Sequence, residues 1–454
     1  MSSLLKIILD FKDEDQLNKF REFLDSGGVV CRWSDGSLTL SIVPIFPDSV
    51  APASYKDLCK TIVIHWFKES GIRTNVSYLK DSIGQGPLWR IDEKCLQEIT
   101  NKKEDRPSLE ILLDGFDNKR IHPSVDFTDD VCLLGFYLPV NDKGREKTGL
   151  CLLSSERELF FADSNELSTR GYSLAYQPVE FTTRMSLPSI KEWVENKKSS
   201  SPLDIFNHLR EFFKTHIDFS EPKAYSYFSL WTMGTYFHQL FNTYPYIYLG
   251  GWKASGKTKT LTVLHCLCFN SVFSGNLSSS AMFRLIQNAR CTMLIDETES
   301  LSNPERAQDF RNILLNGYKT GVKVHRSERT RKDRFEVSEF ECYSPKAIAN
   351  IRGLEDVLES RCIPFTMIKT SKKDVGGTIV DHNDPRRQAM RDELYILLLD
   401  DWKSVKDSYD KTTNEAELES REWELWRPIL SLARYVGGEV YREMLELADR
   451  KSVV

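Results

Sequence analysis

The sequence lacks the cysteine pattern of a disulfide scaffold. Its 454 residues include 10 cysteines, and no two of them are spaced as C-x-x-C. Cysteines this scattered indicate free thiols in a reducing compartment. Cys266 and Cys268 stand two positions apart in a segment with a helical pattern. They should therefore face different directions, and we do not expect them to bind one metal ion together.

Long apolar runs and a dominant charge are missing as well. No run approaches the roughly 18 apolar residues of a transmembrane helix. Residues 1–11 lack the cationic start and the cleavage site of a signal peptide. We therefore expect a cytoplasmic protein that does not enter a membrane. The net charge of −5 excludes a globally basic nucleic-acid coat, so any nucleic-acid site must be a local basic patch.

The N-terminal part, residues 1–196, predicts an α+β domain of open role. Amphipathic helices are expected over Asp13–Leu24 and Cys59–Ser70. Strand-like runs separated by turn residues cover Val131–Pro139, Gly149–Leu153, Glu158–Ala162 and Tyr172–Met185. Trp33, Trp66 and Trp89 could stack on nucleic-acid bases, but such residues are more often part of a core.

Three further regions follow from changes of pattern. Residues 197–243 predict a linker and a helical connector, with helices over Leu203–Thr215 and Pro222–Phe241. Residues 244–370 alternate strands and helices, which predicts an α/β core with a parallel sheet and helices on both faces. Residues 371–454 predict a helical lid, whose first long helix is capped by Asp384 with Pro385 at its first position.

Residues 251–258 match the phosphate-loop pattern G-x-x-x-x-G-K-[ST] at every fixed position. An apolar strand predicted over Tyr246–Leu249 precedes the loop, and a predicted helix follows it. Glycines let successive backbone N–H groups turn toward phosphate oxygens, and the helix start adds a partial positive charge. We expect ATP here, with Lys257 on its β- and γ-phosphates and Thr258 on Mg²⁺. The other expected nucleotide contacts are Gly251, Ser255, Gly256 and Thr260.

A second acidic motif stands downstream, where the apolar run Thr292–Ile295 ends in Asp296 and Glu297. Such a run is often only the end of a strand. After a phosphate loop, however, Asp296 is expected beside the Mg²⁺, and Glu297 is expected to polarise the attacking water as general base.

The acidic pair, taken with two later segments, resembles the AAA+ ATPases. The segment Lys346–Asn350 is similar to their sensor 1 strand, and residues 354–362 end in a Ser-Arg-Cys triplet like that of clamp loaders. The resemblance implies that Asn350 orients the water at the γ-phosphate. It also implies that Arg361 is an arginine finger for a neighbouring subunit's nucleotide, with Arg352 as a competing candidate.

The resemblance covers about residues 203–454 and can be narrowed. Ser279–Leu285, Arg421–Leu430 and Gly437-Gly438 are similar to segments of the helicase-type (superfamily-three and minichromosome-maintenance-like) ATPases of plasmid, phage and primase-associated replication proteins. It implies a homo-oligomeric ring, expected to be a hexamer, and a replication partner such as a primase. It also implies a sensor 2 arginine, for which Arg421 and Arg427 are candidates; both could equally be surface partners of nearby glutamates.

A basic insertion precedes the segment similar to sensor 1. From Lys319 to Arg334 there are seven Lys or Arg and two acids, and alternation on both sides of a polar middle predicts a β-hairpin. In the helicases that this chain resembles, such a hairpin follows the DNA backbone. A solvated charged loop or a subunit-contact loop is the alternative. The expected nucleic-acid contacts are Lys323, His325, Arg326, Arg329, Arg331, Lys332 and Arg334.

These patterns together favour an ATP-driven DNA helicase or translocase of a replication system, hydrolysing ATP between the subunits of a ring. Two alternatives stay open. One is an ATP-switched assembly or loading factor without unwinding activity, which the Ser-Arg-Cys triplet fits equally well. The other is a defence ATPase that senses foreign DNA.

Overall fold

The computed structural model describes residues 118–449 with short gaps, together with two strands nearer the N-terminus. The gaps are residues 129, 143–144, 181–184, 198, 200, 275–277, 297–303, 330–334, 351–353 and 382–383. The chain divides into two compact units, residues 1–117 and 118–454. In the first, β1 (Val29–Arg32) pairs antiparallel with β2 (Ser41–Pro44). The helices predicted near positions 13 and 59, and the three tryptophans named above, lie outside the described residues.

The second unit is built on a five-stranded parallel sheet in the order β10-β11-β14-β9-β15. Its strands are β9 (Tyr246–Gly250), β10 (Val272–Ser274), β11 (Met293–Asp296), β14 (Lys346–Ala349) and β15 (Cys362–Thr366). The three central strands are almost wholly buried, as expected for a parallel sheet covered on both faces. The prediction of an α/β core with a parallel sheet is confirmed.

Helices connect these strands and cover the sheet. They are α9 (Lys257–Leu267), α10 (Ser279–Ala289), α11 (Pro304–Asn316) and the short α12 (Asp356–Glu359). Helix α9 packs against β10, β11 and β14. All five strands run parallel, so their carboxyl ends lie together on one side of the sheet and their amino ends on the opposite side.

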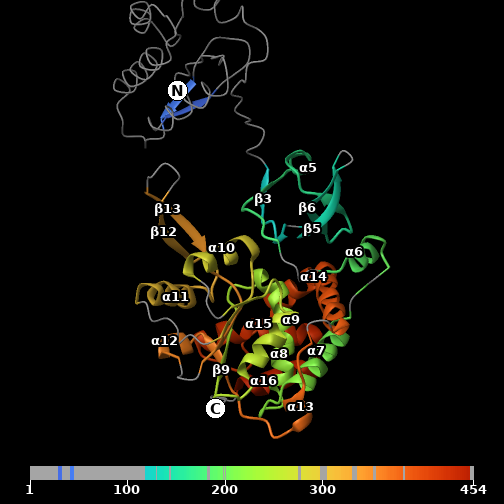
Figure 1. The fold of residues 1–454 in the computed structure, drawn as a ribbon, viewed down its shortest axis with the longest axis vertical. Helices are drawn as coiled ribbons and strands as arrows, with labels where there is room; N and C mark the ends of the chain where they lie inside the picture. Colours follow the sequence, from blue (N-terminus) through green and yellow to red (C-terminus); the bar gives the residue numbers. More distant parts are fainter. Residues whose placement is uncertain are drawn as a thin grey trace, which may run out of the picture. The chain divides into compact units, whose positions relative to one another are not determined.

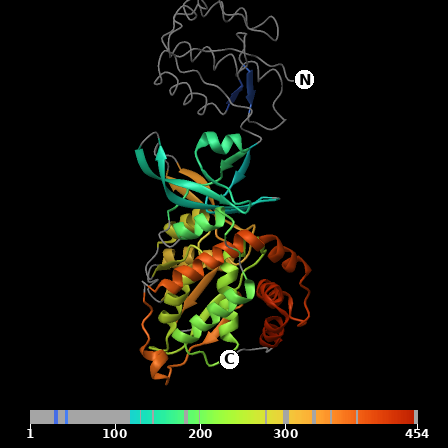
Figure 2. The same ribbon diagram turned by 90° about the vertical axis from the view of Figure 1, so that its right-hand side faces the viewer.

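A second group of helices joins the predicted connector to the predicted lid. They are α7 (Pro202–His216), α8 (Ala224–Phe237), α14 (Pro385–Lys411), α15 (Ser420–Val436) and α16 (Gly438–Asp449). Helix α8 is buried on nearly every side and contacts the other four (Figures 1 and 2). Segments from both ends of the core therefore share one hydrophobic interior. The capping prediction is confirmed, because the Asp384 side chain accepts a hydrogen bond from the Arg386 amide at 2.9 Å.

An antiparallel sheet, β4-β5-β6-β7, precedes the helices, beside the short parallel pair β3-β8. Its elements are β3 (Lys119–Ile121), β4 (Val125–Phe127), β5 (Cys132–Asp142), β6 (Arg145–Ser154), β7 (Leu159–Phe161), α5 (Ser164–Thr169), β8 (Tyr172–Leu174) and α6 (Leu187–Val194). The predicted strands are confirmed, although β8 is shorter than expected. This part docks on α10, where Ser124 Oγ donates to the Ala289 carbonyl at 3.0 Å. His122 Nε2 lies 2.7 Å from the Gln287 carbonyl oxygen.

Candidate functional site

The loop between β9 and α9 has a backbone that depends on two glycines. Gly251 has φ 142°, and a Cβ atom there would lie 2.3 Å from the Met367 carbonyl oxygen. Gly256 has φ 94° and caps α9 in the left-handed region, which favours glycine. Ala254 also has a positive φ of 62°. The glycines of the pattern thus stand where a side chain would distort the loop.

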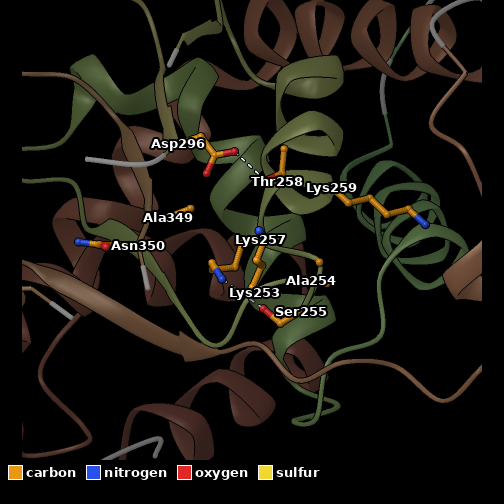
Figure 3. Close-up of a pocket in the computed structure, with 10 residues that line it drawn as sticks. Lys253, Ala254, Ser255, Lys257, Thr258, Lys259, Asp296, Ala349 and Asn350 are labelled. Carbon is orange, nitrogen blue, oxygen red and sulfur yellow. Dashed lines mark hydrogen bonds between the residues drawn. The ribbon is translucent and has the colours of Figure 1, made fainter. Parts of the chain in front are cut away.

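Lys257 is the first residue of α9 and is 8% exposed. Its Nζ donates to the carbonyl oxygens of Gly251 at 2.7 Å and Trp252 at 2.9 Å, and it lies 3.4 Å from Ser255 Oγ. The loop therefore curls around the ammonium group. A cavity of about 410 Å³ opens beside it (Figure 3). Its lining residues are Lys253, Ala254, Ser255, Gly256, Lys257, Thr258, Lys259, Asp296, Ala349 and Asn350.

Two further strands deliver polar groups to this cavity. Asp296 ends β11 and Asn350 follows β14, and these two strands pair in register at Asp296 and Ala349. Thr258 Oγ1 donates to Asp296 Oδ2 at 2.7 Å. The backbone N–H of Asn350 donates to the Leu249 carbonyl at 3.2 Å, which fixes the end of β14 beside β9. A hydroxyl and a carboxylate at this distance are hard oxygen ligands that suit Mg²⁺, so the site fits the predicted metal.

A second cavity of about 220 Å³ adjoins the first. The two share Ala254, Ser255, Gly256 and Lys259, and the added walls include Ile217 and Met367. Ile217, Met367, Ile368 and Val375 give this cavity apolar surface beside the loop, and apolar surface of this kind can pack on a planar ring such as a nucleobase. Motif analysis missed it because its walls come from segments far apart in the chain.

Two basic side chains that line this second cavity, His216 and Lys259, are partly buried, and burial disfavours their charged forms. His216 Nδ1 lies 2.9 Å from the Phe212 carbonyl oxygen, and burial lowers the pKa of its imidazole. Lys259 Nζ donates to the Val375 carbonyl at 2.7 Å, and burial lowers its pKa too. The Lys259 bond holds the short helix α13 (Lys373–Gly377) beside α9.

One residue predicted for this site, Thr260, does not line the cavity. Thr260 is fully buried, and its hydroxyl donates to the Gly256 carbonyl within α9 at 3.1 Å, so it does not line the cavity. Glu297 lies outside the described residues.

The predicted arginine finger, Arg361, lies on the opposite side of the sheet from this cavity. Arg361 directly precedes β15, at the amino ends of the strands. Its Nε donates to the Leu315 carbonyl at 2.8 Å, and its guanidinium lies 5.2 Å from the centre of the Tyr318 ring. The cavity beside Lys257, which lies at the carboxyl ends, is therefore out of its reach. The competing candidate Arg352 falls outside the described residues.

The two sensor 2 candidates also lie away from the cavity. Arg421 Nη1 donates to Ser360 Oγ at 2.9 Å, which puts this arginine beside Arg361. Arg427 Nη2 donates to the Tyr409 carbonyl at 3.0 Å, and its guanidinium lies 4.3 Å from the centre of the Tyr409 ring. Neither lines the cavity at the phosphate loop.

The basic segment forms the expected hairpin, with β12 (Lys323–Arg329) antiparallel to β13 (Phe335–Glu341). Glu339 contacts two basic residues of the stem, Lys323 at 2.7 Å and His325 Nε2 at 3.2 Å. Arg326 lies instead over the ring of Phe283 in α10, 5.0 Å from its centre. The tip residues Arg331, Lys332 and Arg334 and the side chain of Arg329 lie outside the description.

Comparisons with known proteins give distant structural neighbours alone. No family model and no curated protein matches the sequence. Among solved structures, JCV helicase bound to a substituted N-phenylacetamide compound is 11% identical with a TM-score of 0.27, over 51% of this chain and 66% of that one. SCCmec type IV Cch, an active helicase, is 10% identical with a TM-score of 0.30, over 91% and 70%. A second JCV helicase structure, with an inhibitor bound, is 13% identical with a TM-score of 0.24, over 55% and 60%.

The chain thus spans slightly less than two thirds of the first of these helicases. At such identities and TM-scores, function has to be argued from the site itself. Among the described residues, no helix is long and apolar enough to cross a membrane. The same part of the chain contains no group of three or more His, Cys, Asp or Glu that could hold a metal ion.

Proposed function

We propose that this protein is a Mg²⁺-dependent ATPase of the AAA+ type that acts as a DNA helicase or translocase of a replication system. The observation that carries the proposal is the convergence of Lys257, Thr258, Asp296 and Asn350 on one cavity. These residues come from the ends of two adjacent parallel strands, β11 and β14, and the start of one helix, α9. Such a constellation suits phosphoryl transfer, which depends mainly on positioning and electrostatic stabilisation.

The residues divide the work of in-line hydrolysis. The loop amides and Lys257 hold the β- and γ-phosphates, while Asn350 orients the attacking water. Glu297 accepts the proton of that water as general base. Mg²⁺, held by Thr258 and Asp296, supplies charge neutralisation at the phosphates when bound. The adenine ring of ATP occupies the second cavity, which Ile217 and Met367 help to line.

A neighbouring subunit completes the site. Arg361 lies at the sheet edge opposite its own cavity, so a ring of subunits, expected to be a hexamer, would bring it to the nucleotide of the next copy. Arg421 lies beside it and belongs to the same face, which favours a role in trans for both. Arg427 then supports the lid through Tyr409.

DNA is the expected substrate of the hairpin β12–β13. Lys323, His325, Arg329 and the tip residues supply charge for the phosphate backbone without reading sequence. One observation favours the second candidate, a loading factor without unwinding activity. Glu339 already engages Lys323 and His325, so part of the stem charge is neutralised. A partner protein such as a primase or another replication factor could then be the target.

The first test is ATP turnover and strand displacement by the purified protein. Lys257→Ala should abolish turnover. Glu297→Gln should still bind ATP yet hydrolyse it very slowly, because phosphate and metal contacts survive while the water loses its base. Turnover at the wild-type rate in Glu297→Gln would contradict the catalytic assignment. Turnover without strand displacement would favour the loading factor.

A further inference from the structure

A buried lysine, Lys346, lies at the opposite end of β14 from the proposed nucleotide cavity. Lys346 begins this strand and is 0% exposed. Its Nζ donates to three backbone carbonyls, those of Gly317 at 3.1 Å, Cys342 at 3.0 Å and Ser344 at 3.1 Å. Three bonds satisfy every N–H of an ammonium group. The ring of Tyr246 closes the site, with its centre 4.9 Å from Nζ.

The three carbonyls belong to both legs of the basic hairpin. Gly317 follows α11 on the entry leg, ahead of β12, while Cys342 and Ser344 follow β13 on the exit leg. The Ser344 amide also donates to the Gly317 carbonyl at 3.1 Å. Lys346 therefore cross-links the two legs at the root of the hairpin and fixes both to the sheet.

The close packing at this root leaves the lysine little freedom. A Cβ atom on Gly317 would lie 2.2 Å from the Cys342 carbonyl oxygen and 2.6 Å from Lys346 Nζ. Burial also lowers the pKa of Lys346 to about 7. A methionine would fill a similar volume without the cost of burying a charge. The position is thus occupied by the more costly side chain, whose distinguishing property is its three N–H donors.

The other end of the same strand reaches the proposed ATP site. Strand β14 has four residues, which at roughly 3.3 Å per residue span about 13 Å. Ala349 and Asn350 at its carboxyl end line the cavity that Asp296 and Lys257 share. A short, buried strand between two neighbours is rigid, so a displacement at Asn350 reaches Lys346 with little loss.

We infer that Lys346 is a positioning residue that couples the nucleotide cavity to the basic hairpin, by tying both hairpin legs to the strand that carries Asn350. The role rests on the proposed function and deepens it by naming the connection between ATP and DNA. Lys346 contacts neither ligand and acts through the hairpin root.

Contacts that do not involve Lys346 also attach the hairpin to the rest of the protein. Phe340 stacks on Phe283 of α10 with ring centres 5.6 Å apart, and the Glu341 amide donates to Gln287 Oε1 at 3.1 Å. Tyr176 also donates to Glu341 at 3.2 Å. The hairpin stays attached through these contacts when the Lys346 bonds are removed, so its DNA affinity should survive.

The experiment replaces Lys346 with Met in the full chain and measures coupling. ATP turnover is recorded with and without an oligothymidylate probe, and the affinity for that probe is recorded with and without a non-hydrolysable ATP analogue. Coupling between two sites is typically about 5- to 150-fold and is the same in both directions for binding. In Lys346→Met, both the DNA stimulation of turnover and the effect of the analogue on DNA affinity should fall to about one-fold. Basal turnover and DNA affinity without nucleotide should stay within about two-fold of wild type.

Controls separate this role from a purely structural one. Lys214→Met removes an exposed lysine of α7 and should leave coupling at the wild-type value. If Lys346→Met does not fold, Lys346→Gln, which keeps two N–H donors on a shorter stem, should give reduced coupling. A folded Lys346 variant with wild-type coupling, or one that loses basal turnover and DNA affinity together, would overturn the inference. A wild-type protein that does not hydrolyse ATP or respond to DNA would overturn the proposed function and this role with it.

Discussion

At the residue scale, the phosphate loop shows why glycine is required at position 251. Gly251 combines a φ of 142° with a carbonyl oxygen of Met367 that would lie 2.3 Å from an added Cβ. Gly251→Ala should therefore displace the loop from Met367 and lower ATP affinity by about ten-fold or more, which corresponds to ~1.4 kcal/mol. Equilibrium binding of a fluorescent ATP analogue measures this. Gly171→Ala is the matched control, because Gly171 has φ 72° but nothing within 4 Å. Equal affinity in both variants would contradict the argument.

The motif predicts more at the residue scale than the resemblance does. Lys257, Thr258 and Asp296 of the two motifs meet in one cavity because a strand end and a helix start are local features of the sequence. Asn350, which only the resemblance predicted, lines the same cavity. Thr260 follows the same loop but faces the helix interior, since its hydroxyl bonds the Gly256 carbonyl one turn back. Arg421 and Arg427 depend on how α15 packs on other helices, and no local pattern encodes that. Their positions therefore could not be predicted from the sequence.

A buried histidine gives a pH prediction. His238 is 0% exposed; its Nδ1 lies 2.8 Å from the Thr235 carbonyl oxygen and its Nε2 lies 2.8 Å from Gln239 Nε2. Burial lowers its pKa from 6.5 to about 3. Between these values the unfolded chain binds a proton that the folded chain does not, so stability falls as the pH falls below about 6.5.

Unfolding in urea at pH 7 and pH 5 measures the effect. The wild-type protein should lose about 2 kcal/mol more than His238→Gln over this interval, at ~1.4 kcal/mol per pH unit. His208→Gln, which removes a histidine on the exposed side of α7, should follow the wild type closely. Identical pH dependence in all three proteins would show that His238 does not titrate as described.

At the scale of elements, the sequence predicts what is local and misses what is set by the sheet. The strand expected within Lys346–Asn350 is found at Lys346–Ala349, because Ala347, Ile348 and Ala349 form a short apolar run. Strand β15 was not predicted, since Pro364 within it argues against a central strand. The sheet tolerates Pro364 because β15 lies at the edge. Strand β10, Val272–Ser274, is too short for any periodic signal.

The basic hairpin carries the prediction at this scale. Replacing Arg329, Arg331 and Lys332 with Ala should weaken binding to unrelated DNA sequences equally and reduce the salt dependence by up to about three phosphate contacts. Each contact contributes about 0.9 log unit per log salt on duplex and about 0.7 on single strands. Basal ATP turnover without DNA should persist, because none of the described hairpin residues lines the cavity beside Lys257. Fluorescence anisotropy across a salt series measures both quantities.

Two further variants sharpen this test. Glu339→Gln should raise DNA affinity a few-fold, because Glu339 pairs with Lys323 and His325 in the free protein. The exposed triple variant Lys191→Ala, Lys214→Ala, Lys411→Ala removes the same charge elsewhere and should leave the salt dependence unchanged. An unchanged salt dependence in the hairpin variant, with assembly intact, would move the hairpin to a subunit interface and favour the loading factor.

At the scale of the whole molecule, the parallel sheet separates the cavity beside Lys257 from Arg361. The cavity with Lys257 lies at the carboxyl ends of the strands, whereas Arg361 precedes β15 at the amino ends. No rearrangement within a packed core would bring them together, because the sheet between them is continuous and buried. Under the proposed function, a second copy of the chain would therefore supply Arg361 to this cavity.

This separation predicts complementation between two inactive proteins. Arg361→Ala should assemble and bind ATP but lose turnover, since an arginine finger supplies on the order of 10³-fold in rate. Lys257→Ala keeps its own Arg361 but cannot hold the phosphates. In a mixture, a Lys257→Ala subunit offers Arg361 to the intact cavity of an Arg361→Ala neighbour, so ATP turnover should return in part. Arg421→Ala should behave like Arg361→Ala, because it lies on the same face. Mixed assemblies that remain inactive, although size-exclusion chromatography shows both subunits together, would contradict a role in trans for either arginine.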